Sequence, residues 1–222
     1  MNDELPEWMR EAFSSPRMAP YLRATGGDAA AAVRLYWWNT EVSAAFYGPL
    51  HCLEVTLRNS LHDRLREAYG RHDWWTDAPL SPNGLRLVEE ARRKQARRGT
   101  GSCTADDLVA GLSFGFWVSL VSGAPSYDRR LWVPVLHKAF PHYSGRRRSL
   151  HDNLLSLVLL RNRIMHHEPV HHRDLTADHA KIYRMLDCID PRVGKEVEAL
   201  DRVPAVLRDR NDACGGSRPP RF

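Results

Sequence analysis

The stretch RRRSLHDNLLSLVLLRNRIMHH, residues 146–167, decides the fold of this 222-residue chain. Its apolar side chains recur at the spacing of an α-helix and cover most of the helix circumference, until Pro169 ends the run. Such a helix belongs at the centre of a helical bundle or in a subunit interface. The main stripe and the residues that widen it are Leu150, Leu154, Leu157, Val158 and Ile164, then Leu155, Leu159 and Leu160.

Helical spacing continues along the rest of the chain, and no clean alternation of period two indicates a strand. Asp28 is placed to cap a helix, Gly48-Pro49 predicts a break or a kink, and Thr104 with Asp107 resembles a capping box. Pro134 lies where it would interrupt a further helix. The expected helices are 29–47, 50–69, 83–98, 104–121, 129–140, 146–167, 176–189 and 193–207.

These elements predict an all-α fold with one helical domain over residues 28–208. Residues 1–27 are expected to form an N-terminal extension, and residues 209–222 a flexible tail. The composition, 43% hydrophobic and 27% charged, is ordinary for a globular protein. No apolar run approaches the roughly 18–20 residues that span a bilayer, and the acidic start lacks the features of a signal peptide. We therefore expect a cytoplasmic protein with no membrane partner.

The net charge and the positions of the cysteines exclude few classes of function. The net charge of +5 permits an anionic partner such as a nucleic acid, although a solvated helix face explains the basic runs at residues 92–98 and 146–148 equally well. Cysteines 52, 103, 188 and 214 are widely scattered, which indicates idle or buried thiols rather than a disulfide framework or a zinc site.

Polar side chains gather where the central helix ends. After a run of leucines, residues 160–169 read LRNRIMHHEP, and burying such charges beside an apolar stripe costs several kcal/mol unless they are paired. Asn162 and His166 are four residues apart and share a helix face, as do Arg163 and His167. The long side chain of Arg161 can reach the same end of the helix. An imidazole there can move a proton near neutral pH, and a guanidinium can stabilise a reacting phosphate.

This stretch resembles the Abi-like abortive-infection family of the HEPN superfamily. Arg161-Asn162 followed by His166 matches the R-N-x-x-x-H form of the HEPN signature, and the paired histidines resemble those of Abi-like proteins. Two further segments resemble the family's first and middle blocks, and the three occur in order, which is a stronger signal than one short motif. These segments are GPLH and LRNSLH at residues 48–51 and 57–62, and LVAGLSFGFW at residues 108–117.

The resemblance implies a HEPN-like helical bundle with additional helices, which forms a homodimer and acts in phage defence or a toxin–antitoxin system. It also implies an endoribonuclease that needs no metal or cofactor and leaves 2′,3′-cyclic phosphate ends. Arg161 and His166 would then be the catalytic pair and Asn162 an orienting residue. RNA supplies its own 2′-OH nucleophile, so the protein provides only proton transfer and charge stabilisation. A second acid–base group comes from His166 of the other copy.

A second polar row lies on the expected helix 50–69, where Glu54, Arg58 and His62 recur every fourth residue and Asn59 sits beside them. The row is either a salt-bridge ladder on an exposed face or a lining of the same groove, with Glu54 holding an arginine in place. Arg163 and His167 are further supporting candidates, and His167 is the alternative to His166 as the acid–base group. The histidines at 166, 167, 171 and 172 lack the carboxylate or cysteine that would complete a zinc site.

Other interpretations of these features stay open. The Arg161 cluster can be a structural cap at a helix C-terminus, where basic groups favour the helix dipole. A HEPN domain can also be a non-catalytic RNA-binding or regulatory dimerisation module, or the target of a cognate antitoxin protein. Tryptophans can stack on RNA bases, although their apolar helical positions favour packing. These tryptophans are residues 37, 38, 74, 75, 117 and 132.

Overall fold

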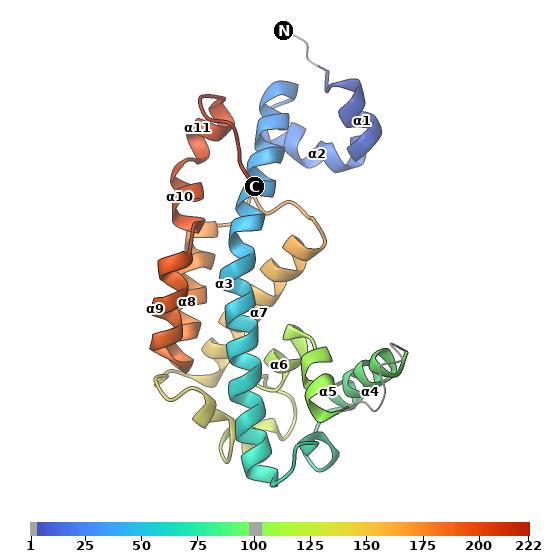
Figure 1. Cartoon of the computed structure of the whole chain (residues 1–222), viewed down its shortest axis with the longest axis vertical. Coiled ribbons are helices and arrows are strands. Elements are labelled where there is room, and N and C mark those ends of the chain that lie inside the picture. Colours follow the sequence, from blue (N-terminus) through green and yellow to red (C-terminus); the bar gives the residue numbers. More distant parts are fainter. Residues whose placement is uncertain (1–3, 98–103) are drawn as a thin grey trace. The chain divides into compact units, whose positions relative to one another are not determined.

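The computed structural model describes residues 4–97 and 104–222, and every regular element in these ranges is helical (Figure 1), which confirms the all-α prediction. Residues 1–3, and residues 98–103 with Arg98 and Cys103, lie outside the described ranges. Short 3-10 turns cover Trp74–Thr76 and Leu136–Ala139, and a π-helical turn covers Asp128–Trp132. The helices are α1 (Glu7–Phe13), α2 (Ser15–Ala24), α3 (Ala29–Tyr69), α4 (Pro82–Ala96), α5 (Ala105–Gly111), α6 (Phe114–Ser119), α7 (Arg147–Met165), α8 (Leu175–Ile189), α9 (Pro191–Leu200), α10 (Val203–Arg208) and α11 (Arg210–Gly215).

The chain divides into two compact units, each built from segments far apart in sequence. Unit 1 comprises Met1–Pro49, Leu160–Ala180 and Ala199–Phe222, and unit 2 comprises Leu50–Leu159 and Lys181–Glu198. Helices α3, α7, α8 and α9 therefore contribute residues to both units. The limits expected from the sequence, residues 28 and 208, do not mark these units.

In unit 1 the C-terminal helices pack on α3 through Trp38, which is fully buried. Its indole N–H donates a hydrogen bond of 3.2 Å to the Val206 carbonyl, and the Arg210 guanidinium lies 4.7 Å from its ring centroid. Arg218 forms an ion pair of 3.1 Å with Glu41, whose side chain is only 4% exposed. Residues 209–222, expected to be flexible, thus contain a helix and a largely buried ion pair, because a buried Glu41 requires a cationic partner.

In unit 2 the second half of α3 supplies the core. Leucines 53, 57, 61 and 65 are fully buried on one face. The indole N–H of buried Trp74 donates to His62 Nδ1 at 3.0 Å, and Trp74 in turn packs against Trp117, with 6.1 Å between ring centroids. Helices α4 and α5 lie side by side (Figure 1), and the Gln95 amide donates to the Asp107 carbonyl at 2.8 Å. The tryptophans at 38, 74, 75 and 117 are therefore packing residues, as their positions predicted.

The predicted helix starts are confirmed at two caps. The Ala31 N–H donates to Asp28 Oδ1 at 2.9 Å, and Thr104 forms a reciprocal capping box with Asp107. Regions predicted as extension are partly helical, since α1 and α2 lie within residues 1–27.

The predicted break at Gly48-Pro49 is wrong, because α3 runs unbroken for 41 residues with Pro49 inside it. A proline in a helix interior costs about 3 kcal/mol. The apolar spacing continues on both sides of it, with Phe46, Leu50 and Leu53 buried, and each such side chain contributes roughly 1.5–3 kcal/mol. Burial therefore outweighs the local penalty.

Three predicted helices are each divided in two. Residues 104–121 form α5 and α6, because the Ser113 hydroxyl accepts a hydrogen bond from the Phe116 N–H at 3.2 Å and starts a new helix. Residues 129–140 form the π-helical and 3-10 turns, with Pro134 between them as the sequence suggested. Residues 193–207 form α9 and α10, where Asp201 Oδ1 accepts from the Val203 N–H at 2.8 Å.

Two buried histidines make the stability of the fold depend on pH. Burial is the main cause that lowers the pKa of His62 and of His171 below the ordinary value of 6.5. The unfolded chain therefore binds these protons first as the pH falls. Their contribution to the free energy of unfolding is present above about pH 6.5 and is lost as the pH falls toward the folded-state pKa values.

We therefore expect urea unfolding to show a lower free energy of unfolding at pH 5.5 than at pH 7.5. His62→Gln retains an acceptor for the Trp74 indole but does not titrate, so this difference should shrink, by at most about 1.4 kcal/mol per pH unit. His142→Gln, at an exposed position, is the matched control and should keep the wild-type pH dependence. An unchanged pH dependence in His62→Gln would contradict the assignment.

Candidate functional site

Helix α7 ends at Met165 in a Schellman motif, which sets the position of the predicted catalytic residues. The His167 N–H donates to the Ile164 carbonyl at 3.0 Å, and the Glu168 N–H donates to the Arg163 carbonyl at 2.8 Å. His167 has a φ of 57°, in the left-handed region that glycine usually occupies at this position. The chain therefore reverses at His167, just before Pro169.

Asn162 and His166 are exposed and one helical turn apart, since the His166 N–H donates to the Asn162 carbonyl at 2.9 Å. Arg161 is half-buried in the turn that precedes them. The amide and the imidazole at the end of α7 are thus accessible to a large ligand such as a polynucleotide.

Two arginines hold the turn: Arg163, a supporting candidate next to this motif, and Arg17 of α2. The Arg163 guanidinium donates to the Pro169 carbonyl at 3.4 Å and lies 3.6 Å from the Glu168 carboxylate. The Arg17 guanidinium of α2 donates to the His167 carbonyl. Both arginines stabilise the backbone that follows α7, and the His167 side chain remains exposed.

A cavity of about 420 Å³ lies against this turn, within unit 1. We call it the motif cavity. Ile164 and His167 contribute to its wall from the end of α7. The remaining lining comes from α1, α2 and α3, and includes Phe13, Arg17, Tyr21, Tyr36 and Asn39.

Asn39 connects α3 to the segment that follows the turn. Its side chain is 5% exposed, and its Oδ1 accepts from the backbone N–H groups of Val170 at 2.8 Å and His171 at 3.1 Å. The sequence interpretation missed Arg17 and Asn39. A polar residue within the apolar stripe of α3 was a signal for Asn39, whereas nothing local distinguished Arg17.

The neighbouring histidines differ in environment. His171 is 8% exposed, its ring centroid lies 5.1 Å from that of Tyr21, and its buried Nε2 has no hydrogen-bond partner among the described residues. Partial desolvation, followed by the charges of Arg163 and Arg173, lowers the pKa of exposed His172. Within residues 4–97 and 104–222, no group of three or more His, Cys, Asp or Glu side chains is placed to hold a metal ion.

The second polar row, Glu54 to His62, belongs to unit 2, whereas the Arg161 motif belongs to unit 1. His62 is 8% exposed and bonded to Trp74, so the expectation of an exposed ladder is wrong for this residue. An apolar core accommodates a neutral imidazole whose acceptor nitrogen is satisfied. Arg58 Nε donates to Asn59 Oδ1 at 3.1 Å, and Glu54 is half-buried. Support of the predicted catalytic arginine, Arg161, by Glu54 stays a prediction.

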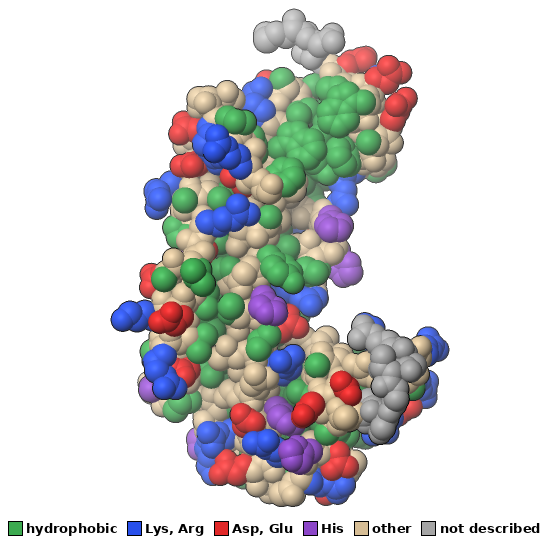
Figure 2. All heavy atoms as spheres, in the orientation of Figure 1, with side chains coloured by type: hydrophobic (Ala, Val, Ile, Leu, Met, Phe, Trp, Pro, Cys, Tyr) green, Lys and Arg blue, Asp and Glu red, His purple; other side chains and the backbone are tan. Residues whose placement is uncertain are grey.

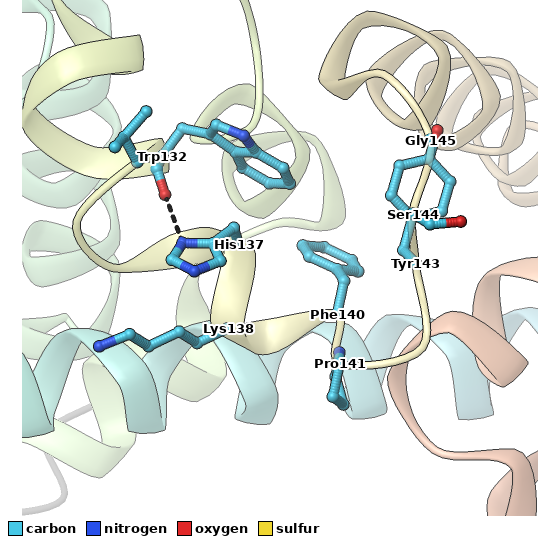
Figure 3. A pocket seen from close by; sticks show the side chains of 9 residues that line it. Trp132, His137, Lys138, Phe140, Pro141, Tyr143, Ser144 and Gly145 are labelled. Carbon is cyan, nitrogen blue, oxygen red and sulfur yellow. Dashed lines mark hydrogen bonds between the residues drawn. The ribbon is translucent and has the colours of Figure 1, made fainter.

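Unit 2 contains a larger cavity, of about 620 Å³, between the turn regions around Trp132 and the loop at residues 141–145 (Figure 3). Figure 3 shows Trp132, Phe140 and Tyr143 around it, with His137 Nδ1 3.1 Å from the Trp132 carbonyl oxygen. Trp132 is thus a half-buried lining residue. None of the residues at the end of α7 lines this cavity.

Four residues of the basic runs form ion pairs with acidic side chains. Arg92 and Arg93 both lie within salt-bridge distance of Glu89, at 3.4 and 3.0 Å. Arg147 lies 3.4 Å from Asp128, and Arg148 lies 3.9 Å from Asp152. On the face drawn in Figure 2, basic and acidic side chains are interspersed. The exposed Arg92, Arg93 and Arg148 favour the solvated-face interpretation, whereas the Arg147 side chain is only 19% exposed. The described cysteines, Cys52, Cys188 and Cys214, are unpaired thiols.

Comparisons with known proteins leave the family unassigned. No protein-family model matches the chain, and neither the curated proteins nor the solved structures searched give a match. Among the described residues, no helix combines the length and apolar character needed to cross a membrane.

The left-handed turn predicts an unusual response to glycine. His167→Gly should raise the free energy of unfolding by about 1 kcal/mol, because glycine adopts a positive φ without the steric cost that a Cβ atom brings. Met165→Gly, two residues earlier and inside the helix, should lower it by about 1 kcal/mol. Denaturant unfolding of the two variants measures both effects, and the Schellman assignment fails if His167→Gly destabilises as much as Met165→Gly.

Proposed function

We propose that this protein is a metal-independent endoribonuclease of the Abi-like HEPN type, acting in phage defence or a toxin–antitoxin system. One observation carries the proposal. An imidazole and an amide, His166 and Asn162, are exposed one turn apart where α7 ends, and an arginine immediately precedes the amide. The same residues form the motif that resembles the HEPN signature.

The chemistry follows from what RNA itself supplies. A base removes the proton of a ribose 2′-OH while its oxygen attacks the adjacent phosphorus, and the bond from phosphorus to the 5′-oxygen breaks. An acid protonates that departing oxygen, which leaves a 2′,3′-cyclic phosphate and a 5′-OH. His166 performs one of these proton transfers, Arg161 stabilises the charge on the phosphate oxygens, and Asn162 orients the phosphodiester.

The second proton transfer requires another group across the phosphate, and a homodimer supplies it as His166 of the second copy. Helix α7 carries apolar side chains that the single chain leaves uncovered, with Leu155 at 41% and Leu159 at 53% exposure. Leu150, Leu154, Leu157 and Leu160 on the same helix are fully buried. Exposed leucines on the most apolar helix support its participation in a subunit interface as well as in the core.

Cleavage assays on wild type and His166→Ala, with tRNA and mRNA in EDTA, test the proposal. Wild type should cut and leave cyclic phosphate ends, and loss of the acid–base group should reduce the rate by roughly 10²–10⁴-fold. His172→Ala, an exposed histidine of the same segment, is the matched control and should keep wild-type activity. His167→Ala decides which of the paired histidines transfers the proton.

Three outcomes would contradict the proposal in different ways. Full activity in a folded His166→Ala protein removes the residue assignment, and loss of wild-type cleavage in EDTA removes the metal-independent mechanism. Salt-sensitive RNA binding without any cleavage identifies the alternative, a non-catalytic RNA-binding or regulatory dimerisation module. A cognate antitoxin would be recognised as a protein that suppresses wild-type cleavage.

A further inference from the structure

We infer that the motif cavity binds one base of the RNA substrate and selects guanine or uracil, which carry an oxygen at position 6 of the purine or position 4 of the pyrimidine, over adenine and cytosine, which carry an amino group there. The inference rests on the proposed function in one respect, since it takes the ligand to be RNA. The cavity adjoins the proposed catalytic end of α7, because His167 and Ile164 form part of its wall.

The orientation of the Asn39 amide determines what the cavity offers to a ligand. Two backbone N–H groups, those of Val170 and His171, approach the same side-chain atom at 2.8 and 3.1 Å, so that atom must be the carbonyl oxygen. This assignment leaves the NH2 group of Asn39 as a donor for the cavity that the residue lines. The Asn39 side chain is only 5% exposed, and the two hydrogen bonds to its oxygen fix its orientation. Its NH2 group is therefore a rigid, directional donor.

Arg17 adds a second donor. One of its terminal nitrogens bonds to the His167 carbonyl, which holds the guanidinium at the cavity wall, and its remaining N–H groups can donate to a ligand. Thr40 also lines the cavity, and its hydroxyl donates to the Tyr36 carbonyl at 3.1 Å, so it can only accept from a ligand. The amide of Asn39 and the guanidinium of Arg17 are therefore both donors on the cavity wall, and they match an acceptor oxygen of a ligand.

Aromatic rings provide a surface for a flat ligand. The half-buried rings of Phe13 and Tyr36 line the cavity with their centroids 5.2 Å apart, and the Tyr36 ring lies 5.2 Å from that of Tyr21, which also lines the cavity but is only 1% exposed. Burial raises the pKa of Tyr21 well above its usual range, so its hydroxyl stays neutral beside a ligand. Stacking of a base on an aromatic side chain contributes roughly 1–3 kcal/mol, and a cavity of about 420 Å³ lies within the range of small-molecule sites.

The donor set distinguishes the bases by their chemistry. Guanine O6 and uracil O4 are acceptors, whereas adenine and cytosine present an amino group at the corresponding edge. An amino group facing the Asn39 NH2 would leave two donors opposed, each without a partner, and such a mismatch lowers affinity strongly. An unpaired RNA segment can unstack a base into such a cavity, as is usual in sequence-specific RNA recognition.

Equilibrium binding of GMP, UMP, AMP and CMP to the wild-type protein, measured by calorimetry, tests the inference without requiring cleavage. GMP and UMP should bind at least about five-fold more tightly than AMP and CMP. Asn39→Asp keeps the acceptor for the two backbone N–H groups but replaces the NH2 donor with an oxygen, so the preference should vanish or reverse. Asn211→Asp, the same chemical change at an exposed position, should keep it.

A second variant covers the case in which Asn39→Asp does not fold. Ser43→Leu adds a bulky side chain to the cavity wall and leaves the Asn39 contacts in place, so all four nucleotides should lose affinity while circular dichroism stays unchanged. Equal affinity for the four nucleotides, or a preference that survives both variants, overturns the inference.

Cleavage mapping separates this inference from the proposed function. Sequencing the ends of RNA cut by wild type should show a bias for guanine or uracil beside the cut, which Asn39→Asp removes. Cleavage with no base bias and no nucleotide preference would overturn the base site and leave the nuclease intact. Nucleotide preference in a protein that never cuts RNA would retain the base site and remove the nuclease.

Discussion

The candidate site depends on the buried side chain of Asn39. Its amide oxygen accepts hydrogen bonds from two backbone N–H groups of the segment after α7. That segment reverses direction in a left-handed turn at His167, and a reversal built on a residue other than glycine needs external support. Asn39 holds the turn from α3, and Arg17 holds it from α2. The exposed Asn162 and His166 therefore lie at the end of a helix whose following segment is held by hydrogen bonds from both α2 and α3.

The left-handed turn at His167 affects both the stability of the fold and the position of the proposed catalytic residues. A histidine in the left-handed conformation costs more than a glycine would, and the surrounding hydrogen bonds offset that cost. The catalytic proposal needs an exposed imidazole, and the Schellman turn fixes the backbone at His166 while its side chain stays exposed. The cavity beside it is a consequence of the same turn, because Ile164 and His167 form one of its walls.

Two buried polar side chains elsewhere, His62 and Glu41, have specific partners. His62 accepts from Trp74, and Glu41 pairs with Arg218. Each contact joins residues that are far apart in the chain or in different elements, and each removes the penalty of an unpaired polar group in an apolar core. A row such as Glu54, Arg58 and His62 thus has members with different environments despite equal helical spacing, because burial varies along the helix.

Periodicity and capping chemistry were sufficient to predict an all-α protein, the Asp28 and Thr104 caps, and a central apolar helix that ends before Pro169, since these depend on near neighbours in the chain. The R-N-x-x-x-H motif and its resemblance to the HEPN signature marked a candidate site, which stays a prediction. The continuity of α3 through Pro49, the burial of His62 and the partners of Asn39 and Arg17 came only from the folded chain. These features depend on which side chains are removed from water by distant segments, and that information is absent from any single stretch of sequence.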